Sequence, residues 1–250
     1  MVRISVSDFI PPILNRTLKF ILRKVQFYGI VKHPFTEIHI QQDVNWVMDI
    51  GANVGDVTKK ALSSFPNSNV VCFEPVNNTR EVLIRNLFKF KNRIHVFPFA
   101  LSDSNSKGTI NLMSFHGANS ILNQSVFHKF SNPHVETLDT QEIELVCLDN
   151  ILSELPSQFF DIVKIDVEGF ELNVLRGGEY FFKNCVSTIM IEVSLMRDSN
   201  VDNQAFVEIF SLLKSYGFYL FNIFDLCYSN NENVPFVVSQ FDCVFKKLNQ

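Results

Sequence analysis

The chain has 250 residues, of which 46% are hydrophobic and 19% are charged, and its formal net charge is −4. This composition is typical of a globular chain and does not indicate disorder. The negative charge and the isoelectric point near 5.9 argue against a broad basic surface, so we expect no nucleic-acid partner.

The cysteines, histidines and apolar runs argue against a disulfide-rich, metal-binding, membrane-spanning or secreted protein. The five cysteines are widely spaced without a C-x-x-C pair, and the six histidines show no metal-ligand spacing, so we expect neither disulfides nor a metal. No apolar run reaches the ~18 residues of a membrane span, and the N-terminus lacks a signal-peptide pattern. A cytoplasmic protein without a transmembrane segment is the expectation.

At the start of the chain, the sequence pattern predicts an N-terminal helical extension over residues 1–40, followed by a single domain over residues 41–250. The segment from Pro12 to about Tyr28 has an amphipathic helical pattern with basic residues outside its apolar face. Such a helix could make a peripheral membrane contact, but packing against the domain is the favoured interpretation. The apolar face consists of Leu14, Leu18, Ile21, Leu22 and Val25.

From Trp46 onward, short apolar runs alternate with helical segments, which is typical of βαβ units and a parallel sheet. The predicted strands are 46–50, 70–74, 94–97, 161–166 and 188–193, and the predicted helices lie near 56–65, 79–89, 172–183 and 203–215. A less regular insert between these elements has strands at 109–113 and 143–147, and a C-terminal strand pair covers 218–224 and 241–246. The predicted fold class is a doubly wound α/β sheet.

A glycine-bearing turn, D-I-G-A-N-V-G, begins at Asp49 between a predicted strand and a predicted helix. Gly51 and Gly55 permit a tight turn and close approach to a ligand, and the amides at the start of the helix favour a negative group such as a cofactor carboxylate. Asn53 stands where a dinucleotide fold would have its second glycine, which weakens a nicotinamide interpretation.

Glu74 ends the next strand and is followed at once by Pro75. A carboxylate in this place can accept hydrogen bonds from two ribose hydroxyls. By itself it could equally be a solvent-facing acid at a strand end. With the glycine turn one βα unit upstream, a nucleoside cofactor is favoured.

The segment K-I-D-V-E-G-F-E, which begins at Lys164, is the second cluster. Lys164 and Asp166 point to the same side of a buried strand, so each needs the other or a neighbour as a partner. Asp166 lies at the carboxyl end of its strand, where ligands bind, Glu168 lies in the turn that follows, and Glu192 ends the next strand similarly. This group could position a hydroxyl and accept its proton, or it could be an ion-pair network that holds the strand ends.

His116 lies in the insert, in the stretch H-G-A-N-S. It is a candidate base at the site, although a loop role is the favoured interpretation.

These segments together resemble the FkbM-type methyltransferase family: D-I-G-A-N-V-G, F-E-P at 73–75, A-L-S-D at 100–103, and the long run from Lys164 to Gly178 followed by I-E-V. The resemblance extends from about Val47 to Val193. It implies a class I, Rossmann-like methyltransferase fold, with a mostly parallel seven-stranded sheet whose last strand is antiparallel. It also implies S-adenosylmethionine as cofactor and O-methylation of sugars or complex natural products.

The resemblance also implies roles by position. The methionine part of the cofactor would lie against the turn, the ribose against Glu74, the adenine near Leu101 in the segment after Ala100, and the methyl and acceptor near Asp166 and Glu168. The turn residues concerned are Asp49, Gly51, Asn53 and Gly55. Ser194 is a departure, because family members often carry a histidine soon after the I-E-V glutamate, so the base here would be Asp166, Glu168 or His116.

Two other functions stay open at this point. A nicotinamide-dependent oxidoreductase shares the turn and the strand-end acid, and a noncatalytic binding module could use the same fold. The acceptor, a small molecule or a glycan, is implied by the family resemblance alone.

Overall fold

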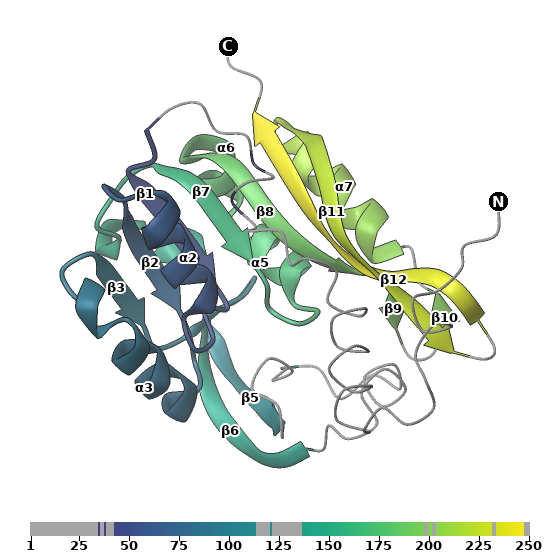
Figure 1. Cartoon of the computed structure of the whole chain (residues 1–250), viewed down its shortest axis with the longest axis horizontal. Helices are drawn as coiled ribbons and strands as arrows, with labels where there is room; N and C mark the ends of the chain where they lie inside the picture. The colour runs from purple at the N-terminus through teal and green to yellow at the C-terminus, as the bar shows by residue number, and fades with distance from the viewer. Residues whose placement is uncertain are drawn as a thin grey trace, which may run out of the picture.

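The computed structural model describes residues 43–113, 137–197, 204–231 and 234–247, together with residues 35, 38, 121, 200 and 201. Within these residues, one large sheet lies between two layers of helices (Figure 1). The predicted doubly wound α/β fold is confirmed. The segment predicted to form an N-terminal amphipathic helix and the candidate residue His116 lie outside the described residues.

The large sheet has the strand order β11-β12-β8-β7-β1-β2-β3. Pairs within β8-β7-β1-β2-β3 are parallel, whereas β12 is antiparallel to both β8 and β11. The antiparallel last strand is therefore confirmed. The strands are β1 (Trp46–Ile50), β2 (Asn69–Phe73), β3 (Ile94–Phe97), β7 (Phe160–Ile165), β8 (Val186–Ser194), β11 (Phe218–Asn231) and β12 (Val234–Lys247).

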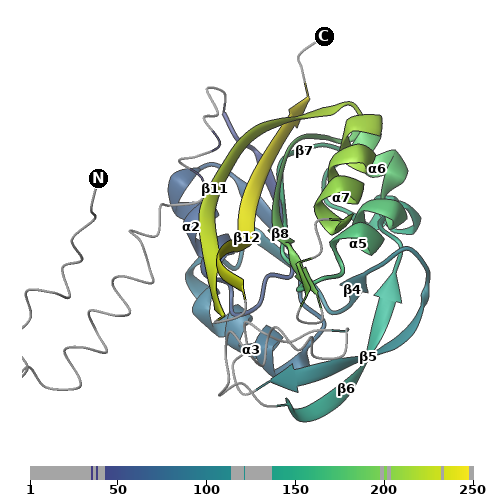
Figure 2. The same ribbon diagram turned by 90° about the vertical axis from the view of Figure 1, so that its right-hand side faces the viewer.

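Helices cover both faces of this sheet, as the edge-on view in Figure 2 shows. One face carries α2 (Asp56–Ser64) and α3 (Asn77–Asn86), and the other carries α5 (Glu171–Gly177), α6 (Glu179–Asn184) and α7 (Gln204–Ser215). Each layer has its own buried apolar cluster against the sheet. Phenylalanines dominate the largest fully buried side chains, as expected for packing residues without a polar group.

The single helix predicted near 172–183 is wrong, because the chain forms two short helices that meet at Gly178. The second helix begins where the Asp149 carboxylate accepts the backbone N–H groups of Tyr180 and Phe181, at 2.8 and 2.9 Å. This tertiary cap satisfies N–H groups that a continuous helix would have bonded internally.

The insert forms a separate three-stranded sheet in the order β4-β6-β5, with β4 (Ala100–Leu101), β5 (Ser106–Met113) and β6 (Thr137–Val146). It projects beyond the end of the large sheet at which β2 and β7 finish (Figure 1). Its buried residues Ile110, Ile143 and Leu145 pack with Val76, which follows β2. The insert strands and the C-terminal pair are longer than predicted.

The remaining described elements are short: η3 (Phe88–Phe90), η5 (Leu148–Asn150), η6 (Leu152–Glu154), β9 (Met196–Arg197) and β10 (Asn200–Val201). All five cysteines are free. Among the described residues, no helix combines the length and apolar character that a membrane crossing requires.

Candidate active site

The turn after β1 is fixed between the ends of β2 and β7. The N–H groups of Gly51 and Ala52 donate to the carbonyl oxygen of Phe73 at 3.1 and 3.0 Å. Gly51, Asn53 and Gly55 have φ angles of 84°, 49° and 90°, in the left-handed region that favours glycine. The chain therefore bends sharply here and presents its backbone to the space beyond the strand ends.

Glu74 lies directly against this turn. Its Oε2 accepts the N–H of Asn53 at 2.9 Å, and its Oε1 accepts the N–H of Val76 at 2.8 Å. Burial raises the pKa of the Glu74 carboxyl to about 7, although both N–H groups and Arg80 act in the opposite direction. The two features that the sequence analysis singled out separately thus share a hydrogen bond.

A cavity of about 330 Å³ opens beside the turn and Glu74. Gly51, Asn53, Glu74 and Leu101, all predicted cofactor residues, line one part of it. The predicted catalytic acids line it too: Asp166, Glu168 and Glu192. One cavity therefore brings together most of the site that was predicted from the sequence.

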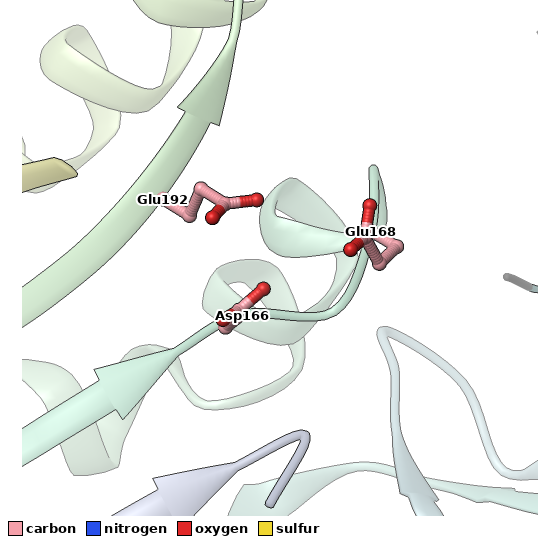
Figure 3. Close-up of side chains that lie close together, drawn as sticks. All are labelled: Asp166, Glu168 and Glu192. Carbon is pink, nitrogen blue, oxygen red and sulfur yellow. The ribbon is translucent and has the colours of Figure 1, made fainter. Parts of the chain in front are cut away.

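The three acids converge from two adjacent strands (Figure 3). Asp166 follows β7, Glu168 lies in the next turn and Glu192 lies on β8, and one carboxylate oxygen from each lies within 4.8 Å of the others. Burial, together with the charge of Asp166, raises the pKa of Glu192 well above its ordinary value. This spacing would also suit a divalent cation, and the absence of a metal stays a prediction.

Lys164 lies behind the acids and is buried, with 5% of its side chain exposed. Its Nζ is 3.5 Å from Asp166 Oδ2 and 3.0 Å from Oδ1 of Asp242 on β12. The prediction that Lys164 pairs with Asp166 or with a neighbour is confirmed. Burial acts to lower the pKa of the Lys164 ammonium, but the charges of Asp166 and Asp242 outweigh it and raise that pKa. Asp242 was not predicted as a site residue, and its one signal in the sequence is an acid within the apolar run F-D-C-V-F.

Asp49 is also buried, and Thr58 Oγ1 donates a hydrogen bond to its Oδ2 at 2.5 Å. Burial raises the pKa of Asp49 to about 6. Within the described residues, Asp49, Gly55 and Lys164 lie outside the cavity lining. Their predicted contacts with cofactor or substrate stay predictions, and Asp49 and Gly55 support the turn from the side of α2 and α3.

The sheet, with its parallel strands and antiparallel last strands, has the class I, Rossmann-like methyltransferase fold. The chain matches the methyltransferase FkbM domain over residues 49–220 and belongs to the FkbM methyltransferase family. This membership favours a methyltransferase over the oxidoreductase alternative.

Several named proteins are similar to this chain. It is 28% identical over 205 residues to the methyltransferase sdnD of Sordaria araneosa, a match that covers 71% of this chain and 79% of sdnD. It is 26% identical over 144 residues to the 2-O-methyltransferase NoeI of Sinorhizobium fredii, covering 53% of this chain and 57% of NoeI. A 27% identical match to the AMB antimetabolite synthetase AmbE of Pseudomonas aeruginosa covers 69% of this chain but spans only 9% of AmbE.

Among solved structures, the fibrillarin pre-rRNA processing protein of Methanococcus jannaschii has a TM-score of 0.50 at 11% identity. The match covers 89% of this chain and 76% of fibrillarin. At this level of identity the likeness concerns the fold alone.

Proposed function

We propose that this protein is an S-adenosylmethionine-dependent O-methyltransferase that acts on a hydroxyl of a sugar, a glycan or another small natural product. The observation that carries this proposal is the single cavity in which the turn at Asn53 and the Glu74 carboxylate meet the acids Asp166, Glu168 and Glu192. The turn and Glu74 would bind a nucleoside-bearing methyl donor, the three acids would bind a hydroxyl acceptor, and methyl transfer requires the two ligands to lie next to each other.

The donor half of the cavity has the chemistry that S-adenosylmethionine requires. Asn53 Oδ1 is buried and, among the described residues, has no hydrogen-bond partner, so it could accept from the amino group of the methionine part. Each Glu74 oxygen accepts one backbone N–H and retains capacity for a ribose hydroxyl. Leu101 and Ile110 offer an apolar surface for the adenine. The bound donor supplies a methyl group made electrophilic by the positive sulfur.

The acceptor half consists of carboxylates, which when ionised only accept hydrogen bonds and therefore suit a ligand rich in hydroxyl donors. Asp166 has 32% of its side chain exposed and faces the cavity, so it is our candidate general base. In the transfer, the acceptor oxygen bonds to the methyl carbon, the carbon–sulfur bond breaks, and the hydroxyl proton passes to Asp166. The name of the relative NoeI, a 2-O-methyltransferase, supports an oxygen acceptor.

Three further inferences complete the proposal. We infer that the large sheet, its two helical layers and the insert belong to one domain, predicted to span residues 41–250; the predicted helical extension over residues 1–40 falls, apart from residues 35 and 38, outside the described residues. The free cysteines are consistent with the reducing cytoplasm that we propose as its location. We also propose that the partner is a small molecule or glycan and not a nucleic acid, because of the net negative charge.

A radiolabelled methyl-transfer screen against glycans, nucleotide sugars and hydroxylated natural products tests the function. We expect the wild type and an exposed-site control, Asp139→Asn, to transfer label, and Asp166→Asn to bind the donor while its transfer rate falls roughly 100-fold or more. Calorimetry with S-adenosylmethionine and its demethylated product accompanies the screen. Absence of binding at millimolar concentration would refute the methyltransferase proposal, and binding without transfer to any acceptor would favour the noncatalytic module.

A further inference from the structure

The turn between β7 and α5 carries Glu168 in an unusual backbone conformation. Glu168 has φ 52° and the following Gly169 has φ 100°. Gly169 adopts this left-handed region without steric cost, but Glu168 carries a side chain and is unfavourable there unless the surroundings hold it in place. Something must therefore hold this turn in the shape that points the Glu168 carboxylate at Asp166 and Glu192 (Figure 3).

Glu171, the first residue of α5, makes the contacts that hold it. Its Oε1 accepts the backbone N–H of Gly169 at 3.0 Å and that of Val167 at 3.4 Å. These two amides lie on either side of Glu168, so a single oxygen atom fixes the backbone both before and after it. Glu171 is buried, with 8% exposed, and lies outside the described lining of the cavity.

The neighbouring helix offers a direct comparison. Glu179 is likewise a glutamate at the first position of its helix, α6, but its side chain is 58% exposed and pairs with Lys183 one turn further along the same helix. Glu171 instead reaches back into the preceding turn. A general preference for acids at helix starts therefore does not account for the contacts of Glu171.

We propose that Glu171 is a positioning residue that fixes the backbone around Glu168 and so holds the Glu168 carboxylate in the acceptor site. Its catalytic consequence rests on the proposed O-methyltransferase function, whereas its effect on the turn can be measured without any activity. Burial of this carboxyl, which raises its pKa to about 7, is consistent with a group retained for its hydrogen bonds.

Three variants of the full chain test this role. Glu171→Gln keeps an oxygen acceptor on a side chain of the same length, whereas Glu171→Met keeps a similar volume without that acceptor. Glu179→Ala is the matched control. Amide-resolved hydrogen exchange by NMR reports on Val167 and Gly169, and transfer assays give kcat and the dissociation constant of the donor.

In Glu171→Met we expect exchange of those two amides to accelerate roughly tenfold or more, and kcat to fall roughly 10- to 100-fold. Donor affinity should stay within about twofold, because the contacts between Glu74 and the turn at Asn53 are unchanged. Glu171→Gln and Glu179→Ala should resemble the wild type in exchange and in kcat. Should the methionine variant not fold, Glu171→Ala replaces it.

Unchanged exchange at Val167 and Gly169 in Glu171→Met would overturn the proposal, as would an equal loss of kcat in Glu171→Gln and Glu171→Met. If the wild type itself transfers no methyl group, the proposed function fails. The exchange data then still decide whether Glu171 holds the turn.

Discussion

The carbonyl oxygen of Asp166 lies so close to Gly51 that a Cβ atom on residue 51 would sit 1.9 Å from it. The backbone N–H of Asp166 in turn donates to the carbonyl oxygen of Ile50 at 3.0 Å. The glycine turn of the proposed donor half and the first acid of the acceptor half are thus in direct backbone contact. The positions of the two halves of the proposed site are therefore fixed relative to each other by contacts between main-chain atoms, which do not depend on side-chain conformation.

Gly51→Ala should therefore destabilise the protein strongly. The new methyl group would clash with the carbonyl oxygen of Asp166, a backbone atom that cannot move aside. Residue 51 also has a φ of +84°, which is strained for alanine, so we expect a loss of roughly 3 kcal/mol or more in the free energy of unfolding. Gly217→Ala is the matched control, because Gly217 has φ +88° but nothing within 4 Å of the added atom. It should lose only about 1 kcal/mol in urea denaturation. Equal losses in the two variants would contradict the close-contact explanation.

Glu74→Gln should weaken donor binding. Both oxygens of Glu74 accept backbone N–H groups, so whichever way the amide turns, its NH₂ group faces one donor. Loss of a charge-assisted bond and of a ribose acceptor should raise the dissociation constant for S-adenosylmethionine roughly 10- to 100-fold by calorimetry. Glu81→Gln, on the exposed surface of α3, should bind as the wild type does. An unchanged constant for Glu74→Gln would remove Glu74 from the proposed donor site.

The sequence predicted the parallel part of the sheet well because its strands are buried on both faces and read as continuous apolar runs. β1 and β3 have the predicted bounds, and the other parallel strands differ by one or two residues at each end. The strand-end acids were predictable for a related reason, since parallel strands that all finish at one edge bring Glu74 and Asp166 to one cavity.

What was missed depends on partners distant in sequence. Asp242 lies 78 residues after Lys164 in the sequence, on β12. The two side chains meet only because β12 pairs with β8 in a particular register. The break at Gly178 depends on Asp149, which caps α6 from another element. The local periodicity of the sequence contains no information on either contact. Glu171 belongs to the segment K-I-D-V-E-G-F-E, but its hydrogen bond to Gly169 depends on the conformation of the turn, which the sequence does not give.

Asp49→Asn should change how stability depends on pH. Burial raises the pKa of Asp49 from 3.8 to about 6, so the folded state favours the protonated form. The stability linked to this group is present below pH 3.8 and is lost as pH rises to about 6. That loss amounts to roughly 3 kcal/mol. Asparagine keeps an acceptor for the Thr58 hydroxyl without the charge.

We therefore expect Asp49→Asn to be more stable than the wild type at pH 8, with the difference disappearing near pH 4. Urea denaturation across this range measures it, and Asp139→Asn, at an exposed position, should follow the wild type throughout. A variant that is less stable than the wild type at pH 8 would show that the Asp49 charge is compensated in the folded protein.

Lys164→Met should be among the most destabilising substitutions near the site. Its ammonium is buried between Asp166 and Asp242, and its removal takes away the cation that pairs with these two acids and lies near Glu192. We expect this to reduce the free energy of unfolding by about 3–5 kcal/mol at neutral pH. Lys107→Met is the control, because its pair with Glu142 is largely exposed, so its removal should leave the free energy of unfolding close to that of the wild type. The double variant Lys164→Met/Asp242→Asn distinguishes charge from packing: if uncompensated charge causes the loss, removing one acid should restore part of the stability. If packing alone causes it, the double variant will be no more stable than the single one.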